Sequence, residues 1–89
     1  MITPAQCRAA RGLLNWTQPQ LAQAANVGTT TVRQFEVSGA MPRPATLTVI
    51  RLAFEAAGIE FIPENGGGAG LRLKKNEADP QKNSEEALP

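Results

Sequence analysis

The sequence predicts a mostly α-helical domain that is followed by a short β-hairpin and a polar, acidic tail. Two capping boxes, at Thr3 and Thr17, each precede a segment with helical periodicity. Residues 63–70 are rich in glycine and separate two short apolar runs, a pattern typical of a hairpin turn. The residues after 75 show no apolar periodicity and are expected to be disordered. These three observations give the order of the elements along the chain.

The first helix is expected from Pro4 to Leu14. Thr3 and Gln6 form an S/T-x-x-E/Q capping box, which satisfies backbone donors at the start of the helix. Pro4 occupies the first helical position, where its fixed φ suits the helix and its missing N–H is not needed. Cys7 lies on the apolar face of this helix and is expected to be a small buried residue.

Two short helices joined by a tight turn are expected within residues 17–39. Thr17 and Gln20 form the second capping box. Residues 26–28, Asn-Val-Gly, interrupt the apolar stripe that follows, and both Asn and Gly tolerate the left-handed backbone of a sharp turn. Trp16, just before the cap, is expected to pack in the core, because surfaces that stack on nucleic-acid bases usually combine several aromatic and basic residues.

The second helix of this pair has one polar and one apolar face. Val32 and Phe35 lie on the apolar side, and a helical wheel gathers on the other side Thr29, Thr30, Arg33, Gln34 and Val37. A compact face of hydrogen-bonding groups with one cation suits the reading of base edges in a DNA major groove. An ordinary solvated helix face has a similar composition, and the turn before the helix favours the DNA interpretation.

At these residues the chain resembles the Cro/repressor-type helix-turn-helix domain of phage repressors and small bacterial XRE-family regulators. The resemblance covers residues 2–58. The residues that match the family's pattern, in order, are Arg11, Thr17, Gln18, Leu21, Ala22, Val27, Val32, Phe35 and Glu36. The resemblance implies a lambda-repressor-like bundle, here of four helices, whose third helix enters the major groove of DNA.

The resemblance also implies roles for individual residues. It pairs Arg11 with Glu36, which would connect the first helix to the end of the third; two exposed, independent charges are the alternative. It gives Gln18 a contact to a backbone phosphate or an outer base, although an ordinary polar residue is also common at this helical position. Ser38 and Arg43, in a loop expected over residues 37–44, are further candidates for phosphate contacts.

The base-reading candidates are the polar residues of the third helix. Arg33 suits guanine, Gln34 suits adenine, and the methyl groups of Thr29 and Thr30 suit thymine. Since one short helix covers only a few base pairs, a homodimer is expected on a symmetric double-stranded DNA operator, with half-sites about 34 Å apart. The sequence therefore predicts a DNA-binding transcriptional regulator, either a repressor or an activator.

A fourth helix is expected over residues 44–57, with Gly58 as its stop. Residues 59–62 and 71–74 predict the two strands of a hairpin whose turn contains Asn65-Gly66. Its apolar face must be covered by the neighbouring helices or by a second copy of the chain, which would make the hairpin a dimerisation element. The glycine run lacks the Lys-Ser/Thr and the following helix of a phosphate-binding P-loop.

Charge divides the chain unevenly. Residues 1–75 carry eight Lys and Arg against four acidic side chains, a net charge of +4, whereas residues 76–89 carry a net charge of −3. A basic body suits contact with phosphates, although scattered solubilising charge explains the count equally well. The expected organisation is a helix-turn-helix domain at 1–58, a hairpin at 59–75 and a disordered acidic tail at 76–89.

Composition argues against several other classes of protein. One cysteine and no histidine leave neither an internal disulfide framework nor an ordinary zinc site, so no metal or other cofactor is expected. No apolar run approaches the length of a membrane span and no signal peptide is apparent, which favours a cytoplasmic protein of bacterial or phage style. Because no acid, base or nucleophile constellation can be assembled, an enzyme is not expected.

One alternative keeps the DNA-binding prediction and adds a second partner. In this interpretation the chain is an antitoxin or antiactivator, a module that binds DNA and also binds a protein through the hairpin or the acidic tail.

Overall fold

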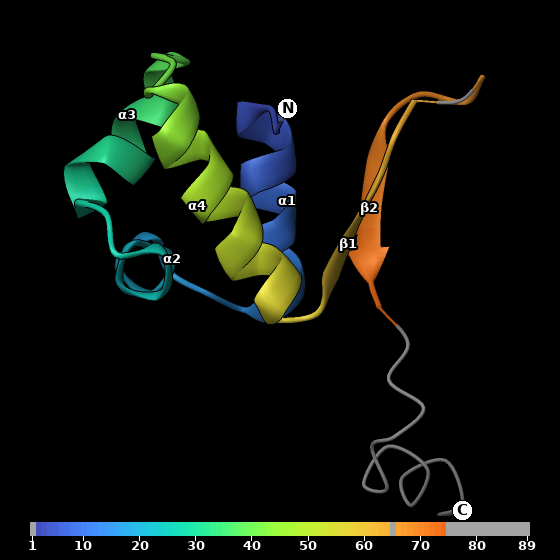
Figure 1. Cartoon of the computed structure of the whole chain (residues 1–89), viewed down its shortest axis with the longest axis horizontal. Coiled ribbons are helices and arrows are strands. Elements are labelled where there is room, and N and C mark those ends of the chain that lie inside the picture. Colours follow the sequence, from blue (N-terminus) through green and yellow to red (C-terminus); the bar gives the residue numbers. More distant parts are fainter. Residues whose placement is uncertain (1, 65, 75–89) are drawn as a thin grey trace, which may run out of the picture.

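The computed structural model describes residues 2–64 and 66–74. Four helices precede an antiparallel hairpin (Figure 1). The elements are α1 (Pro4–Leu14), α2 (Gln18–Ala25), α3 (Thr29–Ser38), α4 (Pro44–Ala56), β1 (Ile59–Ile62) and β2 (Gly70–Leu73). The predicted fold class, mostly helical with a C-terminal hairpin, is confirmed. The acidic tail and the Asn65 turn position lie outside the described residues.

Both predicted capping boxes are formed. The Thr3 hydroxyl accepts a hydrogen bond from the Gln6 N–H at 3.1 Å, and the Gln6 side chain accepts one from the Thr3 N–H at 3.0 Å. Thr17 and Gln20 repeat this arrangement at the start of α2, with distances of 3.2 and 2.7 Å. Each box satisfies two backbone donors that would otherwise lack an intrahelical partner. The local sequence therefore sets where α1 and α2 begin.

The turn between α2 and α3 is also as predicted. Asn26 ends α2 with a left-handed φ of 58°, and Gly28 is the N-cap of α3. Asparagine adopts this conformation more readily than most residues because its short polar side chain can hydrogen-bond locally. Asn15 ends α1 in the same way, with a φ of 61°. These two residues reverse the chain so that α2 packs against both α3 and α4.

The third helix is longer than predicted. The expected loop boundary at Val37 was wrong. Val37 had been counted both on the helical wheel and in the loop, and Ser38 only in the loop, but α3 continues through Ser38 and ends at Gly39, which has a left-handed φ of 73°. The Ser38 hydroxyl donates to the Gln34 carbonyl at 2.6 Å within the last turn. Because glycine adopts the left-handed conformation without a Cβ clash, the helix ends there rather than two residues earlier. Val37 therefore belongs to the helix.

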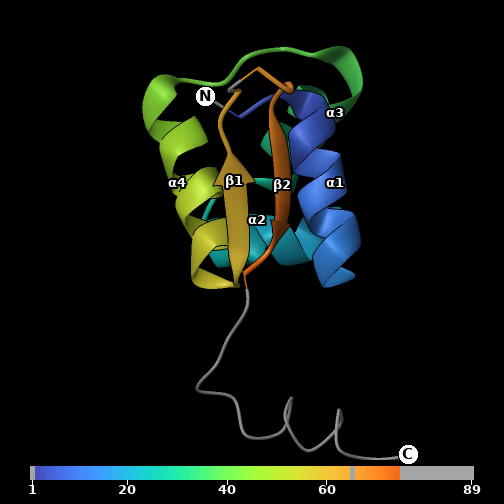
Figure 2. The ribbon, with the colours of Figure 1, turned by 90° about the vertical axis from the view of Figure 1, so that its right-hand side faces the viewer.

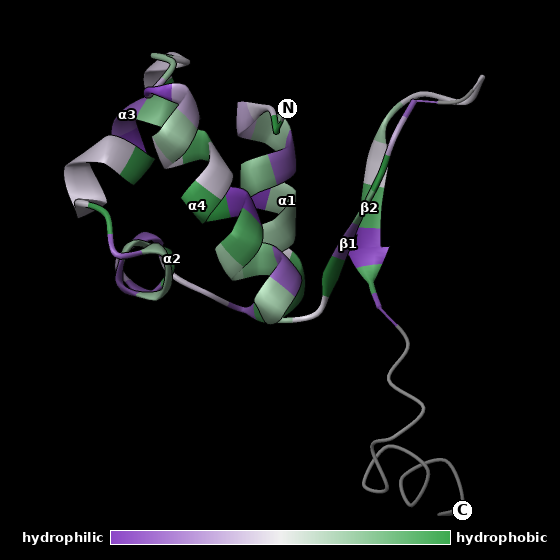
Figure 3. Ribbon diagram, in the orientation of Figure 1, coloured by the Kyte–Doolittle hydropathy of each residue, from purple (hydrophilic) through white to green (hydrophobic). Residues whose placement is uncertain are grey.

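One hydrophobic core joins the helices to the hairpin. Its largest fully buried side chains are Phe35, Phe54, Leu21, Ile50 and Val32. Figure 3 shows apolar segments recurring along α4 and a stretch of nearly neutral hydropathy at the start of α3. Full burial of such a side chain contributes about 1.5–3 kcal/mol. The core therefore holds one side of each helix and leaves the other side exposed.

The hairpin covers one side of the helical bundle. Ile59 pairs with Leu73 and Phe61 pairs with Leu71, so these four residues share one face of the two-stranded sheet. Strand β1 packs against α4 and strand β2 packs against α1 (Figure 2). Of the two partners considered for the apolar face, the chain's own helices cover most of it, although Leu73 remains half-exposed.

Candidate nucleic-acid interface

The outer side of α3 presents the polar residues that the sequence singled out. Thr30, Arg33 and Gln34 are exposed, whereas Thr29 is only partly exposed. No hydrogen bond or ion pair connects the Arg33 guanidinium to another side chain within residues 2–64 and 66–74. Figure 1 places α3 at the edge of the bundle that lies away from the hairpin. This face is therefore open to a large partner.

Two candidates for phosphate contacts lie at the C-terminal end of α3 and in the loop that follows it. Ser38 is exposed at its last turn, and Arg43 is exposed just before α4. Arg43 and Gln34 line one open hollow of about 330 Å³ between α3 and the start of α4. The structure thus brings Arg43 beside Gln34 on the exposed side of α3, although eight residues lie between them in the sequence.

Arg11 and Glu36 form the ion pair expected from the resemblance. The Arg11 Nη2 atom lies 2.6 Å from Glu36 Oε1, and its Nε atom lies 2.7 Å from Oε2. This two-point geometry is the strong form of an arginine–carboxylate contact. Glu36 is 3% exposed. The alternative of two independent surface charges therefore does not describe this structure.

The Glu36 carboxylate accepts two further hydrogen bonds. Cys7 donates its S–H to Oε2 at 2.9 Å, and Gln18 donates its amide N–H to Oε1 at 3.0 Å. Arg8 donates to the Glu36 backbone carbonyl. One buried acid of α3 is thus bonded to side chains of α1 and α2, and we call these five residues, Cys7, Arg8, Arg11, Gln18 and Glu36, the Glu36 network.

Two opposing effects set the charge of Glu36. Burial raises the pKa of its carboxyl, because a charged group is less stable away from water. Hydrogen bonds from Arg11, Cys7 and Gln18, together with the positive charge of Arg11, outweigh burial and hold the pKa below its usual range. Glu36 is therefore ionised at neutral pH, and every buried side-chain nitrogen or oxygen among the described residues has a hydrogen-bond partner.

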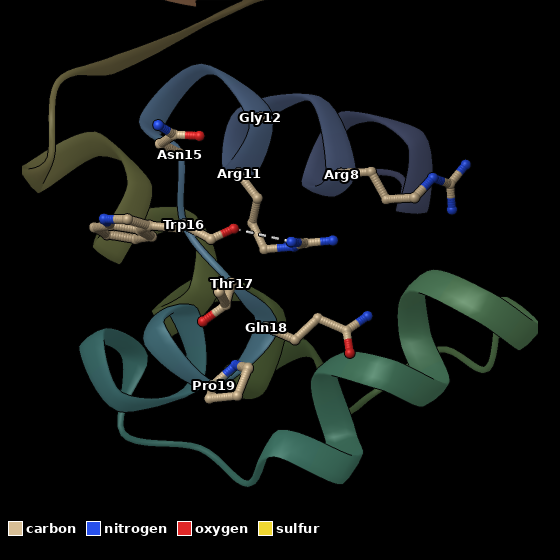
Figure 4. Close-up of a pocket in the computed structure, with 8 residues that line it drawn as sticks. All are labelled: Arg8, Arg11, Gly12, Asn15, Trp16, Thr17, Gln18 and Pro19. Atoms are coloured by element: carbon tan, nitrogen blue, oxygen red, sulfur yellow. Dashed lines mark hydrogen bonds between the residues drawn. The ribbon is translucent and has the colours of Figure 1, made fainter.

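The roles of Cys7 and Gln18 in this network were not predicted from the sequence. Figure 4 shows the side chains of Gln18 and Arg11 reaching toward the same space between α1 and α3. Cys7 precedes Arg11 by four residues, so both project from one face of α1, and this spacing was a usable signal. Gln18 offered no such signal, because its bond to Glu36 depends on how α2 sits against α3. The predicted phosphate contact of Gln18 stays a prediction.

Cys7 has the properties of a structural thiol. It is fully buried, and burial together with its bond to the negative Glu36 strongly raises the pKa of its thiol. It therefore remains protonated and donates a hydrogen bond, and it is unsuited to act as a nucleophile. Within the described part of the chain, no group of His, Cys, Asp and Glu side chains could hold a metal ion, and no helix is long and apolar enough to cross a membrane.

The raised pKa of Cys7 predicts a loss of stability in alkali. The unfolded thiol ionises above about pH 8.5 while the buried thiol does not, so folding loses about 2 kcal/mol between pH 8 and pH 10. Urea unfolding under reducing conditions over this range measures the effect. Cys7→Ser is the matched control, because serine keeps a donor for Glu36 and does not titrate. Parallel pH profiles for the two proteins would contradict the prediction.

Comparisons with known proteins leave this description unchanged. No model of a protein family matches the chain, and no curated protein is significantly similar to it. The function of the chain is therefore inferred from its own residues and their geometry.

Proposed function

We propose that this chain is a sequence-specific DNA-binding transcriptional regulator of the Cro/repressor type, with α3 as the helix that reads the bases. The observation that carries the proposal is the division of α3 into two sides. Arg33 and Gln34 are exposed on one side, while Val32, Phe35 and Glu36 are buried on the other. A helix fixed in this way fits a major groove about 12 Å wide and holds its outer side chains in defined positions.

The residues of α3 have distinct partners in this proposal. Arg33 donates two hydrogen bonds to the O6 and N7 atoms of a guanine, and Gln34 pairs with the N6 and N7 atoms of an adenine. Thr30, and Thr29 at the start of the helix, contact thymine methyl groups. Recognition of this kind is specific because each base pair presents a different pattern of donors and acceptors in the major groove.

Contacts to phosphates set the register of the protein on the duplex. Ser38 and Arg43 lie at and just beyond the C-terminal end of α3, and Gln18 opens the neighbouring helix. Such contacts position a protein on DNA without reading its sequence. The Glu36 network supports this role, because it links α1 and α2 to α3 and so fixes Gln18 relative to the reading helix.

We further propose that the regulator acts in the cytoplasm as a homodimer on a symmetric operator. One α3 helix of ten residues contacts only a few base pairs, which gives limited affinity and specificity. A two-fold symmetric pair would place two such helices in successive major grooves, about 34 Å apart. Binding there represses or activates transcription according to the position of the operator.

Selection of bound sequences from a random pool of DNA duplexes tests the proposal. The wild type is expected to enrich a palindromic site. Arg33→Ala is expected to lose discrimination at one base pair in each half-site, at a cost of about 1–3 kcal/mol, because a guanine then lacks its two donors.

The matched control is Arg72→Ala, which removes the same charge from the hairpin on the opposite side of the molecule from α3 (Figure 1). It is expected to enrich the wild-type site. If no sequence is enriched, and binding is weak and lost in moderate salt, the proposal is wrong, because salt-sensitive binding without preference reflects phosphate contacts alone. Enrichment of a site without two-fold symmetry would contradict the dimer.

A further inference from the structure

Val37 is the most exposed of the large apolar side chains described, with 76% of its surface accessible. A β-branched residue contributes little stability at an exposed helical position, because its χ1 angle is restricted there and its helix propensity is lower than that of alanine. Burial in the core does not explain the residue either. The stability of the fold therefore does not account for an exposed valine at this position, and a contact with a partner would.

The helical repeat places Val37 on the base-reading face. It follows Arg33 by four residues and Gln34 by three, and side chains with these spacings are neighbours on a helix surface. It occupies this place because α3 continues to Ser38. The Val37 side chain, which carries two methyl groups, thus lies one turn beyond the Arg33 guanidinium and the Gln34 amide.

We propose that Val37 reads the 5-methyl group of a thymine in the operator. The inference rests on the proposed function and adds to it a specificity-determining residue. Among the groups that base pairs present in the major groove, the thymine methyl is the apolar one. Val37 lies about 4.5 Å beyond Gln34 along the helix axis, close to the rise of about 3.4 Å between base pairs. The thymine is therefore expected beside the adenine that Gln34 contacts.

The surroundings of Val37 favour a base over a protein partner. A docking surface for a protein needs several apolar side chains in one continuous patch. The exposed side of α3 instead surrounds Val37 with Arg33, Gln34 and Ser38, all of which carry hydrogen-bonding groups. One apolar group among donors and acceptors is the pattern that base edges themselves present in the major groove.

Replacement of thymine by deoxyuridine tests the inference, because uracil differs from thymine only by the missing methyl. Each thymine of the selected site is replaced in turn, and the affinity of the wild type and of Val37→Ala is measured for each duplex. For the wild type, besides any positions that Thr29 and Thr30 contact, one further position in each half-site is expected to lose about fourfold in affinity, as for one buried methyl group. Val37→Ala is expected to bind the thymine and uracil duplexes equally at that position.

Leu52→Ala is the matched control, since Leu52 is also an exposed apolar residue but lies on α4. It is expected to keep the wild-type response to uracil. Val37→Ala should unfold at the same temperature as the wild type or slightly above it, because alanine favours the helix. Sequence-specific binding that tolerates uracil everywhere, or the same set of uracil-sensitive positions in Val37→Ala as in the wild type, would overturn this inference alone. Binding without any sequence preference would overturn the proposed function as well.

Discussion

Replacing Glu36 with alanine is expected to lower the free energy of unfolding by about 3 kcal/mol. Breaking a buried ion pair by removing one partner commonly costs about 3–5 kcal/mol, because the remaining charge is left without compensation. The Arg11 side chain is 19% exposed, so water partly solvates it and the lower end of this range applies. Cys7 and Gln18 also lose their acceptor. Urea unfolding followed by the fluorescence of Trp16 measures the change.

A double-mutant cycle separates the ion pair from the rest of the network. Arg11→Met and Glu36→Ala are measured singly and together, and their effects are expected to be far from additive because the two residues contact each other. Glu55→Ala is the control: its partner Arg51 lies 2.9 Å away on the surface of α4, and loss of such a pair costs at most about 0.5 kcal/mol. Additive effects of Arg11→Met and Glu36→Ala would show that the pair does not stabilise the fold.

Replacing Phe54 with alanine is expected to cost about 3–5 kcal/mol, enough to unfold a large fraction of so small a domain. Phe54 is fully buried and joins three parts of the chain. Its ring lies 5.9 Å from that of Trp16, between α1 and α2, and 6.2 Å from that of Phe61 in β1. Such aromatic pairs add about 0.5–1.5 kcal/mol to the effect of burial.

Two variants make the Phe54 prediction specific. Leu52→Ala, on the same helix, is expected to change stability by no more than about 0.5 kcal/mol because this side chain is 55% exposed. Phe54→Leu should fold and shift the emission of Trp16 to longer wavelength, since the indole loses its aromatic neighbour. Equal losses of stability in Phe54→Ala and Leu52→Ala would show that Phe54 does not join these elements.

The sequence predicted the helix starts better than the helix ends. A capping box is a local pattern, so Thr3 and Thr17 could be recognised without knowledge of the fold. The end of α3 depended on which residue would adopt the left-handed conformation that ends the helix. The sequence Ser38-Gly39 did not decide whether the helix ends before Ser38 or at Gly39. The hairpin was predicted because a turn between two apolar runs is equally local, although its second strand, expected over residues 71–74, runs over Gly70–Leu73. Trp16 was expected in the core, as found, but its stacking on Phe54 could not be predicted because the two residues lie 38 positions apart.

In the candidate site, too, local features could be predicted from the sequence and contacts between distant residues could not. Helical periodicity alone separated exposed Arg33 from buried Phe35. The pairing of Arg11 with Glu36 was expected only from the family resemblance, since no local pattern links residues that far apart. The bonds of Cys7 and Gln18 to Glu36 were missed for the same reason. Whether Thr29, which is only partly exposed, contacts DNA stays a prediction.

The two sides of α3 have different roles in the protein, and this determines which of its residues can be changed without loss of the fold. The buried side, with Phe35 and Glu36, holds the helix in place, while the outer positions 30, 33, 34 and 37 contribute little to folding. Substitutions at those four positions can therefore accumulate without unfolding the domain. A library randomised at these positions would keep the scaffold and vary only its exposed face, and under the proposed function it would yield variants with different DNA specificities.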